Sequence, residues 1–253
     1  MFKKGIILSA IFALSLLCIF SACKKNETSN IKKIKVATDA TWPPMEYVDE
    51  NKKIVGFDID FFEAVAKEGG FEVEFINQEW VGIFTGLVAG KYDAIISSVT
   101  ILEERKQTMD FSIPYVHVGQ ILVVKKDSNV TELSQLEGKK VGVQINTTGA
   151  IEVQKNNKIE LKQFNTIGLA MEALLNGRID AVVCDNPTAL NFVLENQKFK
   201  AALKMAGEIF TTEQYGIVVN KGQAELLELI NNGIKKVQKK GIDKELEKKW
   251  LNF

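Results

Sequence analysis

The sequence is poor in histidine and cysteine and has no excess of charge. Its single histidine, His117, leaves no apparent Ser-His-Asp set and no histidine-based metal cluster. The 32 lysines and arginines balance the 32 aspartates and glutamates, so nothing indicates the broad basic face of a nucleic-acid-binding protein. Low-complexity segments and fixed-period repeats are also absent. The composition of the 253 residues is that of an ordinary globular protein, in one large domain or in two lobes of about 100–150 residues each.

An uncharged run over residues 5–22 follows two lysines at the N-terminus. This pattern predicts a secretion signal, although a run of this length is also at the lower limit for a membrane span. The run ends in "FSAC", which resembles a bacterial lipobox with Phe20 where leucine is usual. We therefore expect a lipoprotein signal peptide over 1–22, lipid on Cys23 and a polar tether over 23–33. Simple secretion or an uncleaved anchor is the alternative.

The three cysteines do not indicate a disulfide framework. Cleavage before Cys23 removes Cys18 together with the signal peptide. If Cys23 carries lipid, Cys184 has no partner, and no disulfide is expected.

From residue 34 onward, expected strands and helices alternate, which is typical of α/β layers with largely parallel sheets. The first strand is expected over 34–39 and the next helix over 57–70, ended by two glycines. The alternation restarts after residue 120 and runs to one long amphipathic helix over 224–241. Two similar phrases, "GKYDAIISS" and "GRIDAVVCD", each place polar residues at the end of a buried strand, where ligands bind in open α/β sheets.

The stretch "SSVTILEERK" raises the question of a binding site. Thr100, followed three residues later by Glu103, matches a capping box and predicts a helix that begins at about Thr100. Arg105 then lies early in this helix, where a cation opposes the helix dipole at a cost of roughly 0.3–1 kcal/mol. This position indicates an anionic partner for the arginine. A ligand carboxylate is one candidate, and Glu104 or another neighbouring surface acid is the alternative.

With these elements placed, the chain resembles the amino-acid-binding proteins of bacterial ABC importers, the polar amino acid group of the periplasmic-type solute-binding proteins. Seven phrases carry the resemblance and follow the order of the family: "ATDATWPPMEY", "VGFDIDFFEAVA", "DAIISSVTILEERK", "MDFSIPY", "GKKVGVQINTTG", "DAVVCDNP" and "QYGIVVNKG". They cover nearly everything after residue 33 and look most like the glutamine, lysine/arginine/ornithine and arginine binders.

The resemblance implies an α/β fold of the type II periplasmic binding protein kind, with two α/β lobes joined by two crossing strands. Lobe 1 is expected over 31–114 and 216–253, and lobe 2 over 120–210. The hinge strands are expected at 115–119 and 211–215. The implied partners are a free L-amino acid and a membrane permease. We expect a monomer without metal, cofactor or nucleic acid.

The resemblance also implies a role for each residue of the site. Arg105 would pair with the ligand carboxylate, and Asp185 would accept its α-ammonium with help from Thr100 and Ser98. Trp42 and Trp80 would sandwich the ligand side chain, whose far end Asp39 could reach. Without the resemblance, core packing would explain the two tryptophans, and a turn or helix cap would explain the aspartate. The expected ligand-binding residues are Asp39, Trp42, Trp80, Ser97, Ser98, Thr100, Arg105, Gln144, Thr147, Thr148 and Asp185.

The sequence departs from the family pattern at several positions. Val81 replaces the usual polar residue before a helix, which removes an N-cap worth about 1 kcal/mol. Asn146 stands where many relatives have glycine, in a turn that can require a positive φ. Cys184 stands where the glutamine binder has histidine. Gln144 stands where that binder has lysine, so a group that repels cations is missing.

These features predict an extracytoplasmic binding protein, anchored through Cys23, for a cationic L-amino acid, with arginine or lysine before histidine. Glutamine is the alternative ligand, since Asp39 and Gln144 could also bind a carboxamide. Two other classes share the fold. Cyclohexadienyl dehydratases are enzymes that need a protonated carboxylic acid in the cleft, and sensory ectodomains continue into a transmembrane segment. We expect no enzyme and no sensor, because the ammonium and carboxylate set is complete and nothing apolar follows "EKKWLNF".

Overall fold

The computed structural model of the protein describes residues 33–251. The signal peptide, the lipid on Cys23 and nearly all of the tether, which were predicted from sequence, lie outside these residues. Within 33–251, no helix combines the length and the apolar composition that a membrane crossing requires.

Lobe 1 is built on a five-stranded sheet in which the first three strands run parallel and the last two join antiparallel. In spatial order the strands are β5 (Glu72–Asn77), β1 (Lys33–Thr38), β6 (Ala94–Ile95), β15 (Val218–Asn220) and β7 (Met109–Phe111). The helices of this lobe are α1 (Phe57–Gly69), α2 (Trp80–Val88), α3 (Glu103–Lys106), α8 (Ala224–Lys239) and α9 (Ile242–Trp250). A small sheet of β2 (Thr41–Trp42), β3 (Glu46–Val48) and β4 (Ile54–Val55) lies between β1 and α1 in the chain.

Lobe 2 repeats this plan with its own five-stranded sheet, again with three parallel strands followed by antiparallel ones. In spatial order the strands are β11 (Glu160–Phe164), β10 (Lys140–Gln144), β12 (Ala181–Asp185), β9 (Gln120–Lys125) and β13 (Leu203–Ala206). Its helices are α4 (Thr148–Gln154), α5 (Ile167–Leu175), α6 (Asn186–Leu190) and α7 (Gln197–Lys200), with a 3-10 turn at Leu133–Leu136 and a π-helical turn at Asn191–Glu195.

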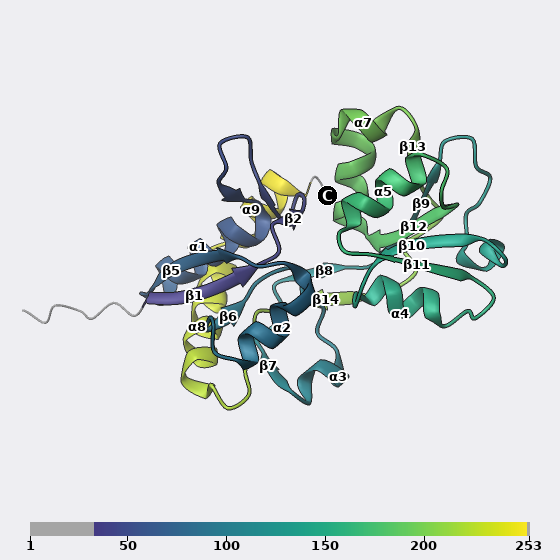
Figure 1. The fold of residues 1–253 in the computed structure, drawn as a ribbon. Coiled ribbons are helices and arrows are strands. Elements are labelled where there is room, and N and C mark those ends of the chain that lie inside the picture. The colour runs from purple at the N-terminus through teal and green to yellow at the C-terminus, as the bar shows by residue number, and fades with distance from the viewer. Residues whose placement is uncertain (1–32, 252–253) are drawn as a thin grey trace, which may run out of the picture. The chain divides into compact units, whose positions relative to one another are not determined.

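Two short strands cross between the sheets. β8 (Val116–Val118) and β14 (Glu213–Tyr215) pair antiparallel with each other, and Figure 1 shows them running between the two groups of elements. β9 follows β8 directly, and β15 follows β14. After each crossing, the chain therefore enters the other sheet as its fourth strand, which is antiparallel to the first three. This change of sheet explains why the alternation of strands and helices restarts midway along the chain.

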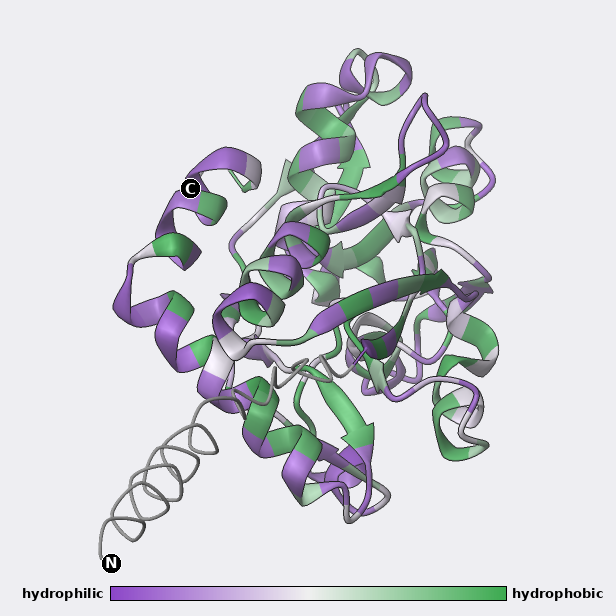
Figure 2. Ribbon diagram, turned by 90° about the vertical axis from the view of Figure 1, so that its left-hand side faces the viewer, coloured by the Kyte–Doolittle hydropathy of each residue, from purple (hydrophilic) through white to green (hydrophobic). Residues whose placement is uncertain are grey.

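The packing of lobe 1 follows from the hydrophobic pattern of its helices. Ile59, Phe62 and Val65, which the sequence placed on one face of α1, are all buried. Burying each such side chain contributes roughly 1.5–3 kcal/mol. The helix ends at Gly70, whose φ of 76° is left-handed. Figure 2 shows the same amphipathic pattern near the C-terminus, where green hydrophobic residues recur along the otherwise purple helices α8 and α9.

The α/β class and the largely parallel sheets were predicted correctly, whereas two element bounds were wrong. The long helix expected over 224–241 ends at Lys239, and a separate helix, α9, follows Gly241, whose φ is 74°. A left-handed residue cannot continue a helix, so the chain turns there. The buried strand expected in "GKYDAIISS" is also shorter, because regular pairing in β6 covers only Ala94–Ile95.

Candidate functional site

Polar side chains gather where the parallel strands of both sheets end. Asp39 directly follows β1, and Ser97 comes soon after β6. In lobe 2, Gln144 ends β10 and Asp185 ends β12. The carboxyl ends of parallel strands are where open α/β sheets bind ligands, because loops and helix starts meet there without a covering strand. The topology therefore brings residues far apart in sequence to one place.

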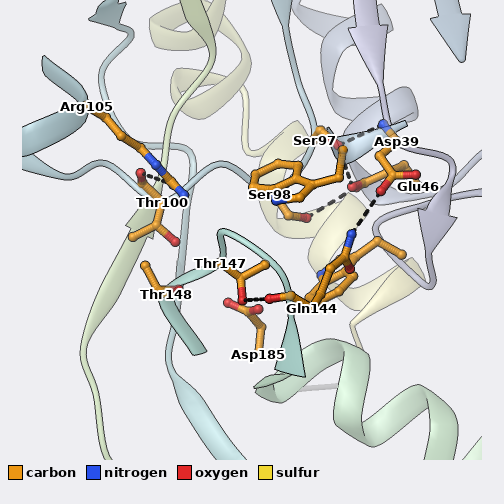
Figure 3. A pocket seen from close by; sticks show the side chains of 12 residues that line it. Asp39, Glu46, Ser97, Ser98, Thr100, Arg105, Gln144, Thr147, Thr148 and Asp185 are labelled. Carbon is orange, nitrogen blue, oxygen red and sulfur yellow. Dashed lines mark hydrogen bonds between the residues drawn. The ribbon is translucent and has the colours of Figure 1, made fainter. Parts of the chain in front are cut away.

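A pocket between the two sheets is lined by side chains from both lobes (Figure 3). It encloses about 340 Å³ of empty space, a figure that includes open solvent at its mouth. All eleven residues predicted for the site lie around it, and Glu46 joins them. The lining consists of Asp39, Trp42, Glu46, Trp80, Ser97, Ser98, Thr100, Arg105, Gln144, Thr147, Thr148 and Asp185.

Arg105 lies in α3, but not at the start of a helix capped by Thr100. The helix begins only at Glu103 and has no side-chain cap, so the predicted capping box is wrong. Thr100 instead forms an isolated β-bridge with Tyr215, and its hydroxyl donates to Glu213. In a capping box the threonine oxygen would accept from a backbone N–H, whereas here the hydroxyl donates to a buried carboxylate, and this charge-assisted bond overrides the local signal.

The guanidinium of Arg105 connects the two lobes. Its Nη1 donates to the carbonyl oxygen of Thr100 at 3.0 Å, and its Nη2 donates to that of Asn146 at 3.2 Å. The group also stands over the rings of Trp80 and Phe84, 5.8 and 5.3 Å from their centroids. Only two of its five N–H donors are used in these bonds, so others remain for an anion.

Burial lowers the pKa of Arg105, and the charges of Glu213 and Asp185 oppose that shift. Arginine stays protonated at physiological pH in spite of such shifts. Its positive charge is therefore held in the pocket by two nearby acidic side chains and not by a close ion pair, since no salt bridge among residues 33–251 includes Arg105.

Acidic groups mark the opposite end of the pocket, as Figure 3 shows for Asp39 and Glu46. Asp39 is 4% exposed and Glu46 is 1% exposed. Thr41 and Gln144 donate to the two oxygens of Asp39, and Ser97 and Ser98 donate to the two oxygens of Glu46. All four donors are neutral, so hydrogen bonds satisfy these carboxyl groups only in part.

The pKa values of these acids reflect their burial and the negative charges near them. Burial raises the pKa of Asp39 from its ordinary value. Burial, together with the charge of Asp58, holds the pKa of Glu46 well above its ordinary range. Burial also raises the pKa of Asp58 to about 7. Asp58 accepts bonds from the backbone N–H of Ser98 and from the hydroxyl of Tyr115, and it thereby holds Ser98 in its left-handed conformation, with φ at 51°.

The two tryptophans line the pocket and are each 7% exposed. The indole N–H of Trp80 donates to the carbonyl oxygen of Ile145 in the other lobe at 3.0 Å. The ring of Trp80 meets Phe84 edge-on, with a centroid distance of 5.1 Å. That the two rings sandwich a ligand side chain stays a prediction.

Asp185, at the end of β12, accepts a hydrogen bond from a neutral side-chain amide. The side-chain amide of Gln120 donates to its Oδ1 at 3.0 Å and to the hydroxyl of Thr148 at 3.1 Å. Burial, and then the charge of Glu213, raises the pKa of Asp185 to about 7. Thr147 caps α4 by accepting from the N–H of Ala150, and both Thr147 and Thr148 line the pocket, so this helix begins at the pocket.

The departures from the family pattern have mixed outcomes. Asn146 has a φ of 60°, which confirms the positive φ predicted for this turn. Val81 is 48% exposed and non-helical, and Gly82 after it has a φ of 103°, so α2 is interrupted there and Val81 is not its N-cap. Cys184 is buried next to Asp185, and burial raises the pKa of its thiol well above the ordinary value.

Sequence reasoning missed three polar residues of this region: Glu46, Gln120 and Glu213. Each is buried, with at most 9% of its surface exposed. A buried charged residue is uncommon unless it is paired or functional, but burial is not visible in a single sequence. Glu46 did stand in the quoted phrase "ATDATWPPMEY", two residues after the second proline, where its alternation with Met45 and Tyr47 could have placed it on the pocket side of β3.

The fold and the pocket together define a two-lobed α/β binding protein of the type II periplasmic kind. The chain belongs to the bacterial extracellular solute-binding proteins, family 3, and the match covers residues 34–253.

Three similar proteins illustrate the family. A probable histidine-binding protein of Neisseria gonorrhoeae is 36% identical over 83% of this chain and 80% of its own length. The crystal structures of an arginine-, lysine-, histidine-binding protein, ArtJ from Geobacillus stearothermophilus, match with 38% identity and a TM-score of 0.82 over 88% of this chain and 96% of that chain. An ancestral arginine-binding protein bound to glutamine matches with 43% identity and a TM-score of 0.83 over 87% and 98%.

Proposed function

We propose that the protein is the extracytoplasmic binding component of an amino-acid ABC importer and that it binds a cationic L-amino acid, arginine or lysine before histidine. The observation that carries the choice of ligand is the acidic end of the pocket. Asp39 and Glu46 are buried there, and no ion pair among residues 33–251 includes either of them. A buried carboxylate without a cation is costly, and a guanidinium or ammonium would relieve that cost.

A second feature of the same end supports a ligand rich in donors. The side-chain oxygen of Gln144 has no hydrogen-bond partner among the described residues, although the residue is only 2% exposed. Its amide nitrogen already donates to Asp39. The oxygen is therefore one more acceptor, beside two carboxyl groups, and a guanidinium offers five N–H donors in one plane.

The other end of the pocket suits the two α-groups of an amino acid. Arg105 has N–H donors left for a carboxylate, and the first amides of α4 after Thr147 add further donors. Asp185 lies close enough to this region for its charge to act on Arg105, so an ammonium and a carboxylate can be bound next to each other. In this arrangement the side chain would run from Arg105 past the two tryptophans toward Asp39.

The names of similar proteins support a cationic ligand and leave glutamine as the second candidate. The relatives described above are named for histidine or for arginine, lysine and histidine. Glutamine is the second candidate, because an ancestral arginine-binding protein of this fold has been crystallised with glutamine and because Gln144 can bond a carboxamide as well as a guanidinium.

Titration calorimetry with the twenty L-amino acids tests the proposal. We expect arginine or lysine to bind most tightly, with one site per chain. Glutamine binding about tenfold tighter than both would replace the cationic ligand by the neutral one. The variant Glu46→Gln keeps the shape of the side chain but cannot ionise, so it cannot become the carboxylate that a bound cation would favour. It should weaken arginine by roughly tenfold and glutamine by less than about threefold.

We also infer binding and not catalysis. A dehydratase of this fold would need a carboxylic acid that donates a proton to its substrate. The raised pKa of Glu46 makes this residue a candidate for such an acid, so the enzyme alternative can be tested. Incubation with prephenate or arogenate should give no aromatic product, and turnover above the level of a Glu46→Gln variant would establish an enzyme.

The lobes are proposed to move as units about the crossing strands. We assign lobe 1 to 31–114 and 216–253, lobe 2 to 120–210, and the hinges to 115–119 and 211–215. The pairing of β8 with β14 supports this assignment, since the two crossings lie side by side and can bend together.

The remaining parts of the proposal concern the cell envelope. The chain is expected to act as a monomer, tethered by lipid on Cys23, and to pass its ligand to a membrane permease. Cys23→Ser should release the protein into the soluble fraction or leave the unprocessed precursor. Mass spectrometry of the mature protein should find a diacylglycerol on Cys23, and an unmodified N-terminus at another residue would refute the anchor.

A further inference from the structure

Glu213 lies in the crossing strand β14 and is bonded to hydroxyl groups from both lobes. Its Oε2 accepts from the hydroxyl of Thr100 in lobe 1 and from that of Thr148 in lobe 2, both at 2.8 Å. Its Oε1 accepts from Thr211 of the same crossing segment at 2.8 Å. The side chain is only 9% exposed, so these three donors are its main partners. One carboxylate thus joins the two halves of the site.

These bonds determine how the hydroxyl groups can meet a ligand. A carboxylate only accepts hydrogen bonds, so the proton of Thr100 and the proton of Thr148 both point toward Glu213. The oxygen of Thr100 is then left with lone pairs alone on its remaining sides. Lone pairs suit an α-ammonium and repel a carboxylate. The oxygen of Thr148 already accepts from Gln120, which also donates to Asp185.

We propose that Glu213 is a positioning residue of the amino-acid site: it orients the Thr100 and Thr148 hydroxyl groups so that the site accepts an α-ammonium beside Asp185, and it ties this arrangement to both lobes at once. The inference rests on the proposed function, because it requires a ligand with an α-ammonium group. Glu213 itself does not line the pocket and acts through the two threonines.

The negative charge of Glu213 also favours a ligand that carries an α-ammonium group. It opposes the loss of charge on Arg105 that burial favours. It is also the second cause, after burial, of the raised pKa of Asp185. An α-ammonium bound beside Asp185 is attracted by the charges of both acids, whereas a ligand that has only the carboxylate meets additional negative charge. Glu213 should therefore favour ligands that carry both α-groups.

The test compares arginine with 5-guanidinopentanoate, which keeps the side chain and the carboxylate but lacks the α-amino group. Wild type, Glu213→Ala and Glu213→Gln are titrated with both ligands by calorimetry, and circular dichroism checks that each variant is folded. Gln214→Ala is the matched control, because Gln214 is the next residue of β14 and bonds His117 on the exposed side. The measured quantity is the Kd of 5-guanidinopentanoate divided by the Kd of arginine.

We expect this ratio to fall by roughly tenfold or more in Glu213→Ala, because both hydroxyl groups lose their acceptor. In Glu213→Gln it should fall by about threefold or more, because the neutral amide removes the negative charge and accepts weaker hydrogen bonds from the two threonines than a carboxylate does. If the alanine variant does not fold, the glutamine variant decides. The control should keep the ratio within about twofold of wild type.

The outcomes distinguish a failure of the positioning role of Glu213 from a failure of the proposed function. A ratio that stays within about twofold of wild type in the folded Glu213 variants refutes the positioning role, even if both ligands bind more weakly, because a purely structural residue weakens both alike. If wild type prefers lysine or glutamine, 6-aminohexanoate or 4-carbamoylbutanoate replaces the analogue, and the inference is tested in the same way. If wild type binds no amino acid, the proposed function fails and the inference fails with it.

Discussion

Replacement of Arg105 by alanine is the sharpest test of the carboxylate end of the pocket. The guanidinium donates to backbone oxygens of Thr100 and Asn146, one in each lobe, and these two bonds fix its plane. The rings of Trp80 and Phe84 support its face. A ligand carboxylate would meet a group that is already oriented, so little entropy remains to be lost on binding.

The expected loss follows from the burial of this group. Removing one partner of a buried, hydrogen-bonded charge pair costs about 2–5 kcal/mol, which corresponds to an affinity lower by about 30-fold to several thousandfold. Arg105→Lys keeps the charge but cannot reproduce the planar pair of donors. It should lose about 1.5–3 kcal/mol, roughly the value of one charged hydrogen bond.

Calorimetry with arginine measures both variants, and Arg178→Ala serves as the control. Arg178 is exposed, and it lies on lobe 2 away from the pocket between the lobes. Its removal should leave the affinity unchanged while altering the net charge by the same amount. If Arg105→Ala binds arginine within about threefold of wild type, the assignment of Arg105 to the ligand carboxylate is wrong.

Three further predictions concern the acidic end, the lobes and pH. Asp39→Asn should weaken arginine by roughly tenfold and glutamine by less than about threefold in competition calorimetry, and the reverse order would refute charge pairing. Small-angle scattering should show a smaller radius of gyration with saturating arginine, since the ligand would contact both lobes; an unchanged radius would show that they do not close on it. Burial raises the pKa of Asp58 and Asp185 to about 7, so these groups hold protons in the folded protein that they release on unfolding. The free energy of unfolding of the ligand-free protein should therefore fall as the pH rises from about 4 to about 7. Because an ammonium favours ionised Asp185, the rise in Tm caused by arginine should be larger at about pH 8 than at about pH 5, and an equal rise at both would contradict this.

The sequence was informative wherever function coincides with a regular element. Asp39, Ser97 and Asp185 follow strands whose hydrophobic runs are easy to recognise, so their common position at the carboxyl ends could be predicted. The resemblance added Arg105 and Gln144, which no periodicity would have brought together. All of these residues do line one pocket.

The errors arose where a local pattern competes with tertiary contacts. Thr100 and Glu103 match a capping box by spacing alone, but the hydroxyl of Thr100 bonds Glu213, which is 113 residues away in sequence. The buried acids Glu46 and Glu213 have neighbours that are unremarkable in the sequence. Their importance lies in their burial and in their lack of a close cation, and both properties depend on how the strands of two lobes meet.

The bonds across the pocket suggest how closing and binding are connected. Three side-chain hydrogen bonds among residues 33–251 join the lobes directly: Trp80 to the Ile145 carbonyl, Arg105 to the Asn146 carbonyl, and Gln144 to Asp39. Each uses a side chain that also lines the pocket. Trp80 uses its single N–H in this way, but Arg105 keeps further N–H donors and Gln144 keeps its oxygen. A ligand can therefore add its own bonds without breaking those between the lobes. Ligand binding and lobe contact should then stabilise each other, which is the thermodynamic requirement for a protein that closes on its ligand.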